Sequence, residues 1–467
     1  MMSVDDVDYA LKVLDEALSK GAIYVLVRLQ EKIYESITAD CGVLKNYGVN
    51  RISGLGLYVI ADGGAGYVYT TSLSRDEVSK MVENAISIAK SSVISRRYNH
   101  GFVKPVRDSY TVNVKEDPQE VEPEDKVRVV LDVNRESIKR ESIVSAVTRM
   151  AIERDKKFLL SSEGTEVKLD ITCVGFAHTS VAKSGELVER VGDHKTFVGG
   201  YEFIRSNDWF EFADELNQLA VKASMAKTPS PGSYVAVVDN DVVGLLLHEA
   251  LGHASEGDLV INGESVLSGK IGEKVASELV TIFDEGVIDG GYPVPYDDEG
   301  VPKRRTKIID EGVLTGYLSN REVSADLNQD LTGNGRAQDV MHIPLVRQTN
   351  YYMKGGDWSV EELFDGISYG IYLKGVGSIG GEVRPSVGTY TFSIGPSYII
   401  RNGDVAELVR GVSVSGMILE TLKEVDAVAG DLKISTSVFG GCGKDMQSVR
   451  VGFGGPHLRV KKVVIGG

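Results

Sequence analysis

Apolar residues recur with a helical period in several segments of the first half of the chain. Residues 9–18 are typical of an amphipathic helix. Ser74-Arg-Asp-Glu77 is a capping box, and it opens a helix whose apolar positions from Val78 to Ala89 share one face. Pro123, with acidic neighbours, starts a further helix, and residues 209–225 form another.

Alternation of apolar and polar residues predicts strands between these helices. Residues 23–27 form a β-branched and apolar run. Residues 142–199 alternate at length and are interrupted by turn signals at Glu163-Gly164 and Ser184-Gly185. This pattern predicts an antiparallel meander.

The clearest linker is the stretch 227–232, Lys-Thr-Pro-Ser-Pro-Gly, and the pattern beyond it is one of glycines and short strands. Residues 308–318 predict a hairpin around Glu311-Gly312, and residues 398–409 predict another around Asn402-Gly403. Residues 369–376 and 389–394 are further strand candidates.

These elements predict an α+β protein. A chain of 467 residues is too long for one compact core, so we expect more than one domain. We expect an N-terminal mixed α/β domain (1–115) and a middle region of helix and antiparallel strands (116–226). A largely antiparallel, β-rich C-terminal domain (227–467) would then carry the candidate chemistry.

Composition narrows the class of protein. The formal charge of −16 argues against nucleic acid or an anionic membrane as a partner. No run of apolar residues is long enough to span a membrane, and the acidic residues 3–8 do not resemble a signal peptide. Three scattered cysteines offer no disulfide framework, so we expect a cytoplasmic protein.

The most informative string is His248-Glu-Ala-Leu-Gly-His253, which has the form His-Glu-x-x-x-His. Two imidazoles and a carboxylate are what a hydrolytic metal centre needs, namely nitrogen ligands and a base that takes a proton from water. On a regular helix the two rings would point about 140° apart and could not meet one ion. We therefore expect either a one-residue bulge or a helix that ends before His253, with Gly252 permitting the distortion. The helix should start near Asn240 or Asp241.

Two interpretations of this string remain open from the spacing alone. Histidines and a glutamate near a helix end are also compatible with hydrogen-bonded core or capping residues that hold no metal. Glu256 and Asp258, which follow, could supply a further ligand, hold a ligating histidine by a hydrogen bond, or lie in a solvated loop.

A third ligand must come from elsewhere, and Cys442 is the best candidate. It is flanked by glycines that allow close approach, and Lys444 nearby would favour the thiolate form. Cys41 and Cys173 fit ordinary small apolar positions. Two histidines and a cysteine, with one position open to water, make a workable catalytic zinc site.

Several segments together resemble the TldD/PmbA family of metallopeptidases, and specifically its TldD branch. The metal string extends to residues 247–258, and similar stretches occur at 297–302, 309–318, 332–336, 347–350 and 440–444, with a weaker one at 54–63. The match runs from about residue 229 to about residue 460. Leu251 stands where the bacterial proteins tend to have valine.

The resemblance implies an intracellular, zinc-dependent peptidase that acts on unstructured peptides or unfolded proteins. Its implied ligands are His248, His253 and Cys442, which would hold one Zn²⁺ per active subunit, and Glu249 is the implied catalytic glutamate. The family also implies a homodimer, or a heterodimer with a PmbA/TldE-type subunit that lacks the ligands.

Arg336 and Arg347 are candidates for stabilising an oxyanion or anchoring a substrate carboxylate. The alternative is that both arginines have a structural role and do not contact substrate. For the whole chain, the alternative function is a catalytically silent scaffold or binding subunit of such a complex. A weaker alternative is a metal hydrolase acting on other amides or esters.

Overall fold

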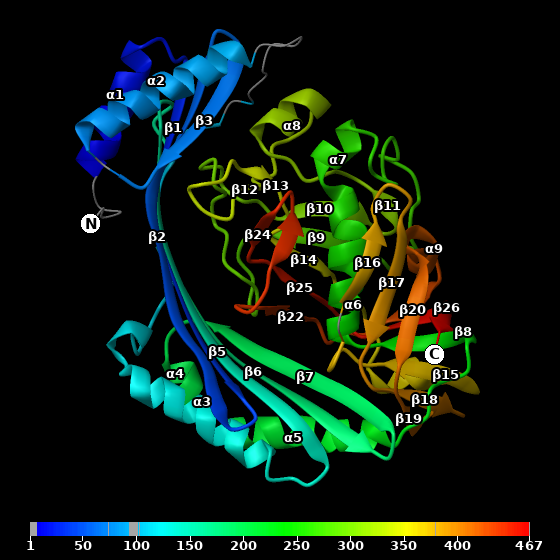
Figure 1. The fold of residues 1–467 in the computed structure, drawn as a ribbon. Helices are drawn as coiled ribbons and strands as arrows, with labels where there is room; N and C mark the ends of the chain where they lie inside the picture. Colours follow the sequence, from blue (N-terminus) through cyan, green and yellow to red (C-terminus); the bar gives the residue numbers. More distant parts are fainter. Residues whose placement is uncertain (1–6, 73, 93–100, 102, 379, 467) are drawn as a thin grey trace.

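The longest alternating stretches of the sequence form the longest strands of the protein. We describe a computed structural model, in which residues 7–72, 74–92, 101, 103–378 and 380–466 are placed. A long curved sheet arches around a C-terminal lobe that lies in its concave side (Figure 1). The acidic N-terminal residues 3–6, part of the stretch on which the signal-peptide expectation rests, lie outside the described residues.

The arched sheet has seven strands in the order β3-β2-β1-β5-β6-β4, with β7 also paired to β6. Its strands are β1 (Tyr24–Asp40), β2 (Val43–Ala61), β3 (Gly64–Thr70), β4 (Arg107–Thr111), β5 (Ile143–Ser161), β6 (Glu166–Ser184) and β7 (Leu187–Val198). The meander expected over residues 142–199 is confirmed as β5, β6 and β7.

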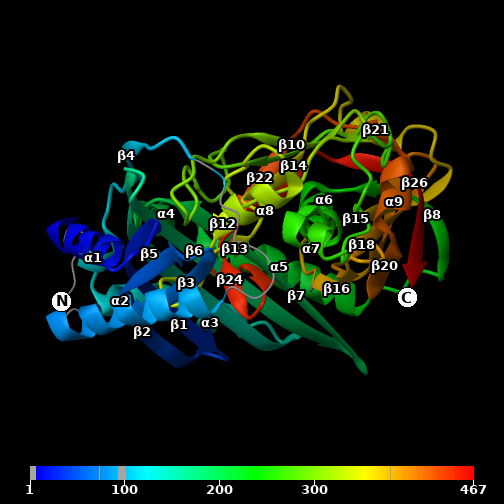
Figure 2. The same cartoon turned by 90° about the horizontal axis from the view of Figure 1, so that it is seen from above.

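Helices cover one face of this sheet. Alternate side chains of each strand point to opposite faces, and the apolar set points toward the helices. The helices are α1 (Val7–Ser19), α2 (Arg75–Ser91), α3 (Pro123–Ser137), α4 (Glu202–Ser206) and α5 (Trp209–Ser224). Val25, Val27 and Leu29 of β1 pack in the core under α1 and α2. Figure 2 shows α1 and α2 at the end of the arch that lies away from the C-terminal nine-stranded sheet. The helices expected from the sequence are confirmed, including the cap of α2, where the hydroxyl of Ser74 accepts from the amide of Glu77.

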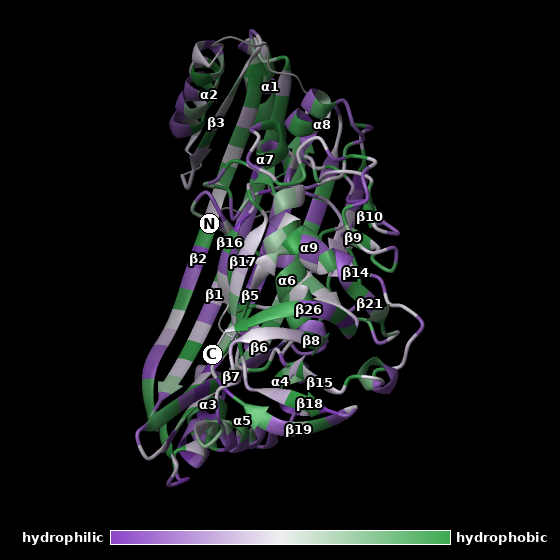
Figure 3. Cartoon of the chain, turned by 90° about the vertical axis from the view of Figure 1, so that its right-hand side faces the viewer, coloured by the Kyte–Doolittle hydropathy of each residue, from purple (hydrophilic) through white to green (hydrophobic). Residues whose placement is uncertain are grey.

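The opposite face of the arched sheet is polar yet buried, because it meets the C-terminal lobe. Arg28 and Gln30 of β1 lie between the apolar positions of that strand and are each 1% exposed. The alternation of hydrophilic and hydrophobic residues along the long strands is visible in Figure 3. Charged side chains, rather than an apolar layer, therefore form much of the contact between the two lobes.

The C-terminal lobe contains a nine-stranded sheet, a six-stranded sheet and two small hairpins. The nine-stranded sheet consists of β8 (Gly232–Val238), β15 (Tyr369–Leu373), β16 (Gly380–Arg384), β17 (Thr389–Ile394), β18 (Ser397–Arg401), β19 (Asp404–Val409), β20 (Val412–Met417), β21 (Val425–Val428) and β26 (Leu458–Gly466). The six-stranded sheet consists of β9 (Ile282–Glu285), β10 (Thr306–Asp310), β11 (Val313–Leu314), β14 (Asn350–Met353), β22 (Lys433–Thr436) and β25 (Gly452–Gly455). The hairpins are β12 (Gly335–Arg336) with β13 (Leu345–Val346), and β23 (Cys442–Lys444) with β24 (Gln447–Val449).

Four short helices complete this lobe: α6 (Asn240–Leu246), α7 (Gly257–Ile261), α8 (Arg321–Leu327) and α9 (Ile418–Lys423). The hairpin expected at Asn402-Gly403 is confirmed by positive φ angles at both residues, 51° and 86°. The lobe is mainly antiparallel as expected, but β8 pairs in parallel with β15, and β14 with β25. Parallel neighbours need a long crossover, and here the His-Glu-x-x-x-His string lies in the chain that joins β8 to β15.

The mixed fold with a sheet-rich C-terminal region is confirmed. The arched sheet runs continuously across the domain boundary expected at residue 115, since β1 pairs along its length with β5. The division of the chain into separate domains at residue 115 stays a prediction. No helix among the described residues is both long and apolar enough to cross a membrane.

Candidate metal centre

The helix that carries the histidines changes its winding where the sequence predicts a distortion. Asp239 caps α6 by accepting from the amide of Val242 at 3.0 Å. After Leu246 the chain makes a π-helical turn over Leu247–Gly252 and then a short 3₁₀ turn over His253–Ser255. The wider turn brings the two histidine rings to a centroid separation of 5.4 Å. Of the two distortions expected, the bulge is confirmed.

Cys442 reaches the same point from a distant part of the chain. It begins β23, and its Sγ lies 3.3 Å from Nε2 of His253. One donor atom from each of His248, His253 and Cys442 lies within 4.8 Å of the other two. His248 and Cys442 are each 3% exposed, and His253 is half-buried. The structure therefore brings the three expected ligands together.

The nitrogen and sulfur donor atoms of this cluster fit a zinc ion. Nδ1 of His248 is buried and has no hydrogen-bond partner among the described residues. His253 places its other nitrogen, Nδ1, 3.3 Å from the carboxylate of Glu256, so that Nε2 faces the cluster. A carboxylate on the outer nitrogen of a histidine is the usual support for a ligating imidazole. A buried nitrogen without a partner is costly unless something else, such as a cation, satisfies it.

The electrostatics of the cluster favour a thiolate. Burial alone would raise the pKa of Cys442, but the imidazoles of His248 and His253 outweigh it and hold the pKa well below its usual range. Burial likewise opposes the charged form of His253, yet the Glu256 carboxylate and Cys442 raise its pKa well above the ordinary value. A thiolate is the form of cysteine that binds metals.

Lys444 pairs with carboxylates. This differs from the expectation that Lys444 itself favours the thiolate form of Cys442. Its Nζ lies 2.9 Å from Glu256 and 2.6 Å from Asp258, so the ammonium group pairs with these acids. The groups that lower the pKa of Cys442 are the two imidazoles. Glu256 is fully buried, and although burial raises its pKa, His253 and Lys444 lower it to about 2. Of the roles considered for Glu256, the geometry favours support of His253.

Glu249 follows His248 in the π-helical turn and is half-buried. Within the part of the chain that the structure describes, no side chain or amide forms a hydrogen bond or ion pair with its carboxylate. An unengaged carboxylate next to an expected ligand is free to accept and release a proton.

The two candidate arginines are engaged with backbone carbonyls. Arg336 is 5% exposed and donates to the carbonyls of Gln348 and Arg450, at 2.6 Å each. Arg347 is fully buried and donates to the carbonyl of Cys442. These contacts favour the structural interpretation of both arginines over substrate binding.

Sequence reasoning missed Gln348. Its Nε2 donates to the carbonyl of His248 at 3.0 Å, so the side chain supports the π-helical turn directly. The only signal in the sequence was its place in the stretch 347–350, which belongs to the family resemblance.

Comparisons with known proteins identify the family of this chain. Three family models match the chain: PmbA/TldA metallopeptidase domain 1 over residues 25–89, the central domain over residues 116–224, and the C-terminal domain over residues 231–467. A metalloprotease from Methanocaldococcus jannaschii is 34% identical over 98% of this chain and 99% of its own. A protein of Saccharolobus solfataricus, named a zinc metalloprotease TldD homolog, is 31% identical over 98% of this chain and 99% of its own.

The fold is also found in a solved structure. TldE from Thermococcus kodakarensis superposes with a TM-score of 0.76 at 18% identity, covering 98% of this chain and all of that one. The matches in sequence span the described lobes from β1 to the C-terminal sheet. The chain belongs to the PmbA/TldD family.

Proposed function

We propose that this protein is a zinc-dependent peptidase that hydrolyses unstructured peptides or unfolded proteins. The observation that carries the proposal is the convergence of His248, His253 and Cys442 beside the unengaged carboxylate of Glu249. A silent scaffold has no chemical need for all four residues, which disfavours that alternative. Relatives named as metalloproteases support the peptidase class.

Each residue of the cluster has a separate task in this mechanism. Zinc, when bound by His248, His253 and Cys442, supplies Lewis-acid chemistry that activates water and polarises a carbonyl. Glu249 accepts the proton of the attacking water at a carboxylate oxygen and delivers it to the leaving amine. Glu256 keeps the proton of His253 on Nδ1 and leaves Nε2 as a ligand.

An unpaired strand edge near the histidines supports the proposal that the substrate binds as an extended peptide. Strand β16 ends the nine-stranded sheet and contacts the π-helical turn. Within the described residues its outer edge pairs with no other strand. An extended peptide that adds to such an edge is held mainly by main-chain hydrogen bonds, which tolerates varied side chains. A backbone segment that is already hydrogen-bonded inside a folded protein is not available for this pairing.

A second subunit is part of the proposal. The structural likeness to TldE supports a heterodimer with a PmbA/TldE-type chain, and the alternative is a homodimer. We also place the protein in the cytoplasm, a location that its three free cysteines support.

Metal analysis combined with a cleavage assay tests the proposed function. The purified protein should contain about one zinc per chain and cleave an unfolded peptide. A chelator should abolish cleavage, and added zinc should restore it. Cleavage that persists without metal, or zinc-loaded protein of either subunit composition that cleaves no peptide, would contradict the proposal.

A further inference from the structure

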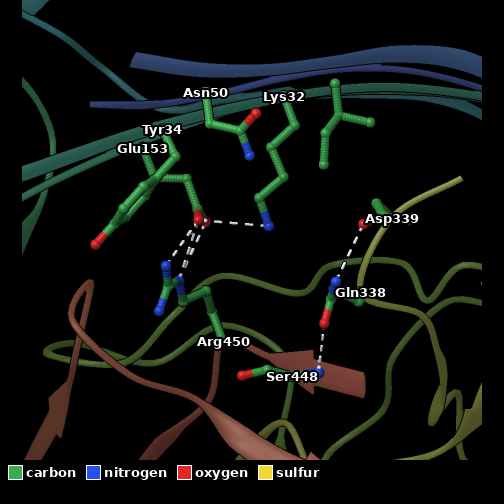
Figure 4. Close-up of a pocket in the computed structure, with 9 residues that line it drawn as sticks. Lys32, Tyr34, Asn50, Glu153, Gln338, Asp339, Ser448 and Arg450 are labelled. Carbon is green, nitrogen blue, oxygen red and sulfur yellow. Dashed lines mark hydrogen bonds and ion pairs between the residues drawn. The ribbon is translucent and has the colours of Figure 1, made fainter. Parts of the chain in front are cut away.

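Glu153 lies far from the metal ligands in sequence and in a different lobe, yet it is connected to them. It belongs to β5 and points from the arched sheet toward the C-terminal lobe, where it is 2% exposed. Its carboxylate accepts from Arg450, at 3.2 Å from Nε and 2.8 Å from Nη2, and lies 3.4 Å from Nζ of Lys32. Figure 4 shows Glu153 and Lys32 reaching from the sheet strands toward Arg450, beside a small pocket.

Arg450 links the two ends of the β23–β24 hairpin, which carries Cys442. It directly follows strand β24, and its Nη1 donates to the carbonyl of Gly440, so one side chain ties both ends of the hairpin. Within that hairpin Cys442 pairs with Val449. An arginine fixed at this place therefore limits how far the thiol can move.

Arg450 is also linked to His248. The carbonyl of Arg450 accepts from Nη2 of Arg336, and Nη1 of Arg336 donates to the carbonyl of Gln348. Nε2 of Gln348 in turn donates to the carbonyl of His248. A continuous set of hydrogen bonds thus joins Glu153 to the segments of two metal ligands.

We propose that Glu153 is a positioning residue of the metal centre, which orients Cys442 and His248 through Arg450. The proposal rests on the zinc site proposed above but does not depend on peptide cleavage. Its consequence is that docking of the arched sheet on the C-terminal lobe completes the metal site. Ligands held in place before binding cost less ordering when the metal arrives, and distant supports of this kind contribute to metal affinity.

Loss of the Glu153 charge leaves two cations without their shared partner. Arg450 and Lys32 would then be left as two neighbouring cations with little exposure, since their side chains are 15% and 16% exposed. A buried charge that loses its partner is strongly unfavourable, so Arg450 is expected to turn away and release the hairpin.

The test compares Glu153→Gln with a matched control. Glu163→Gln removes another ion pair between the lobes, because Glu163 lies 2.9 Å from Arg321 of α8. Within the described part of the chain, Arg321 also donates to the carbonyl of Gly101 and the hydroxyl of Tyr24, neither of which belongs to an expected ligand. The pair therefore reports the effect of weaker lobe docking alone. Zinc affinity is measured by competition with a chromophoric chelator. We expect a loss of about tenfold in Glu153→Gln and no change in Glu163→Gln.

A second readout does not need zinc at all. The reactivity of Cys442 toward a thiol reagent is followed in metal-free protein with Cys41, the exposed cysteine, replaced by serine. Glu153→Gln should react several-fold faster than the parent, and Glu163→Gln at the same rate. If Glu153→Gln does not fold, Arg450→Lys, which keeps the charge but cannot span Glu153 and Gly440 together, should show the same two effects.

Unchanged zinc affinity and unchanged Cys442 reactivity in a folded Glu153→Gln protein would overturn the inference. Equal losses in both variants would also overturn it, because general docking would then explain the effect. Failure of the parent protein to bind zinc would count against the proposed function, whereas the thiol reactivities would still decide the role of Glu153.

Discussion

The amide group of Gln348 occupies the space that a side chain at Gly252 would need. A Cβ added at Gly252 would lie 2.1 Å from Oε1 and 2.6 Å from Nε2 of Gln348, which is fully buried. The glycine therefore serves the contact between the π-helical turn and Gln348 more than backbone freedom, since its φ is −60°, an ordinary helical value.

Gly252→Ala tests this relationship. The new methyl group should displace Gln348, break its bond to the carbonyl of His248 and lower stability by about 1–3 kcal/mol. Thermal unfolding and zinc affinity would measure the effect. The double variant Gly252→Ala/Gln348→Ala should lose less than the sum of the single variants, and strict additivity would show that the two residues do not interact.

Glu249→Gln should lose cleavage by about 100-fold or more because the amide cannot accept the proton of water. The substitution leaves His248, His253 and Cys442 intact, so zinc content should stay at the parent level. Kinetics on an unfolded peptide and metal analysis of the same preparation measure both. Retained turnover would remove Glu249 from the mechanism.

Cys442→Ser should lower the zinc content of the purified protein, because a hydroxyl is a far weaker ligand than a thiolate. Cys41→Ser provides the control, since that thiol is exposed and lies in the turn between β1 and β2. The stoichiometry is read from elemental analysis after gel filtration. A fully loaded Cys442→Ser protein would refute the ligand role.

Glu256→Gln should weaken zinc binding by about 10- to 100-fold. The variant removes the negative charge that lies against both His253 and Lys444, so the ring loses its support. Chelator competition measures the affinity. Asp258→Asn is the matched control: Asp258 pairs with Lys444 but with neither histidine, so its effect should be smaller. A larger effect at Asp258 would reverse the assignment.

His178 should make stability depend on pH. It is fully buried, with Thr148 at 2.9 Å and Ser180 at 3.0 Å, and burial lowers its pKa to about 4 from an ordinary 6.5. Between these values the unfolded chain binds a proton that the folded protein does not. Stability should therefore fall as pH drops from 6.5 to 4, by about 3 kcal/mol in total.

Denaturant unfolding of the parent and of His178→Gln across this range measures the effect. The carboxylates titrate in both proteins, so the difference between the two curves isolates His178. Parallel curves would show that the buried imidazole does not titrate as expected.

Local pattern was enough to predict α1, α2, α3 and α5, the meander and the tight hairpins. Each depends on residues within a few positions, such as the Ser74 cap of α2 or the Asn402-Gly403 turn. The same holds for the helix that carries the histidines, where the five-residue spacing predicted a distortion that the π-helical turn confirms. The parallel pairing of β8 with β15 was not predicted, because it joins strands separated by more than a hundred residues.

Local patterns in the sequence identify which residues could bind a metal, and binding of one ion by both histidines requires an irregular helix between them. Tertiary structure alone decided that Cys442 meets both histidines, that Gln348 supports the turn, and that Glu153 of the other lobe reaches Arg450. Helical and strand periods are short-range properties of the chain. Contacts across hundreds of residues depend on how whole sheets pack, and no local pattern records that.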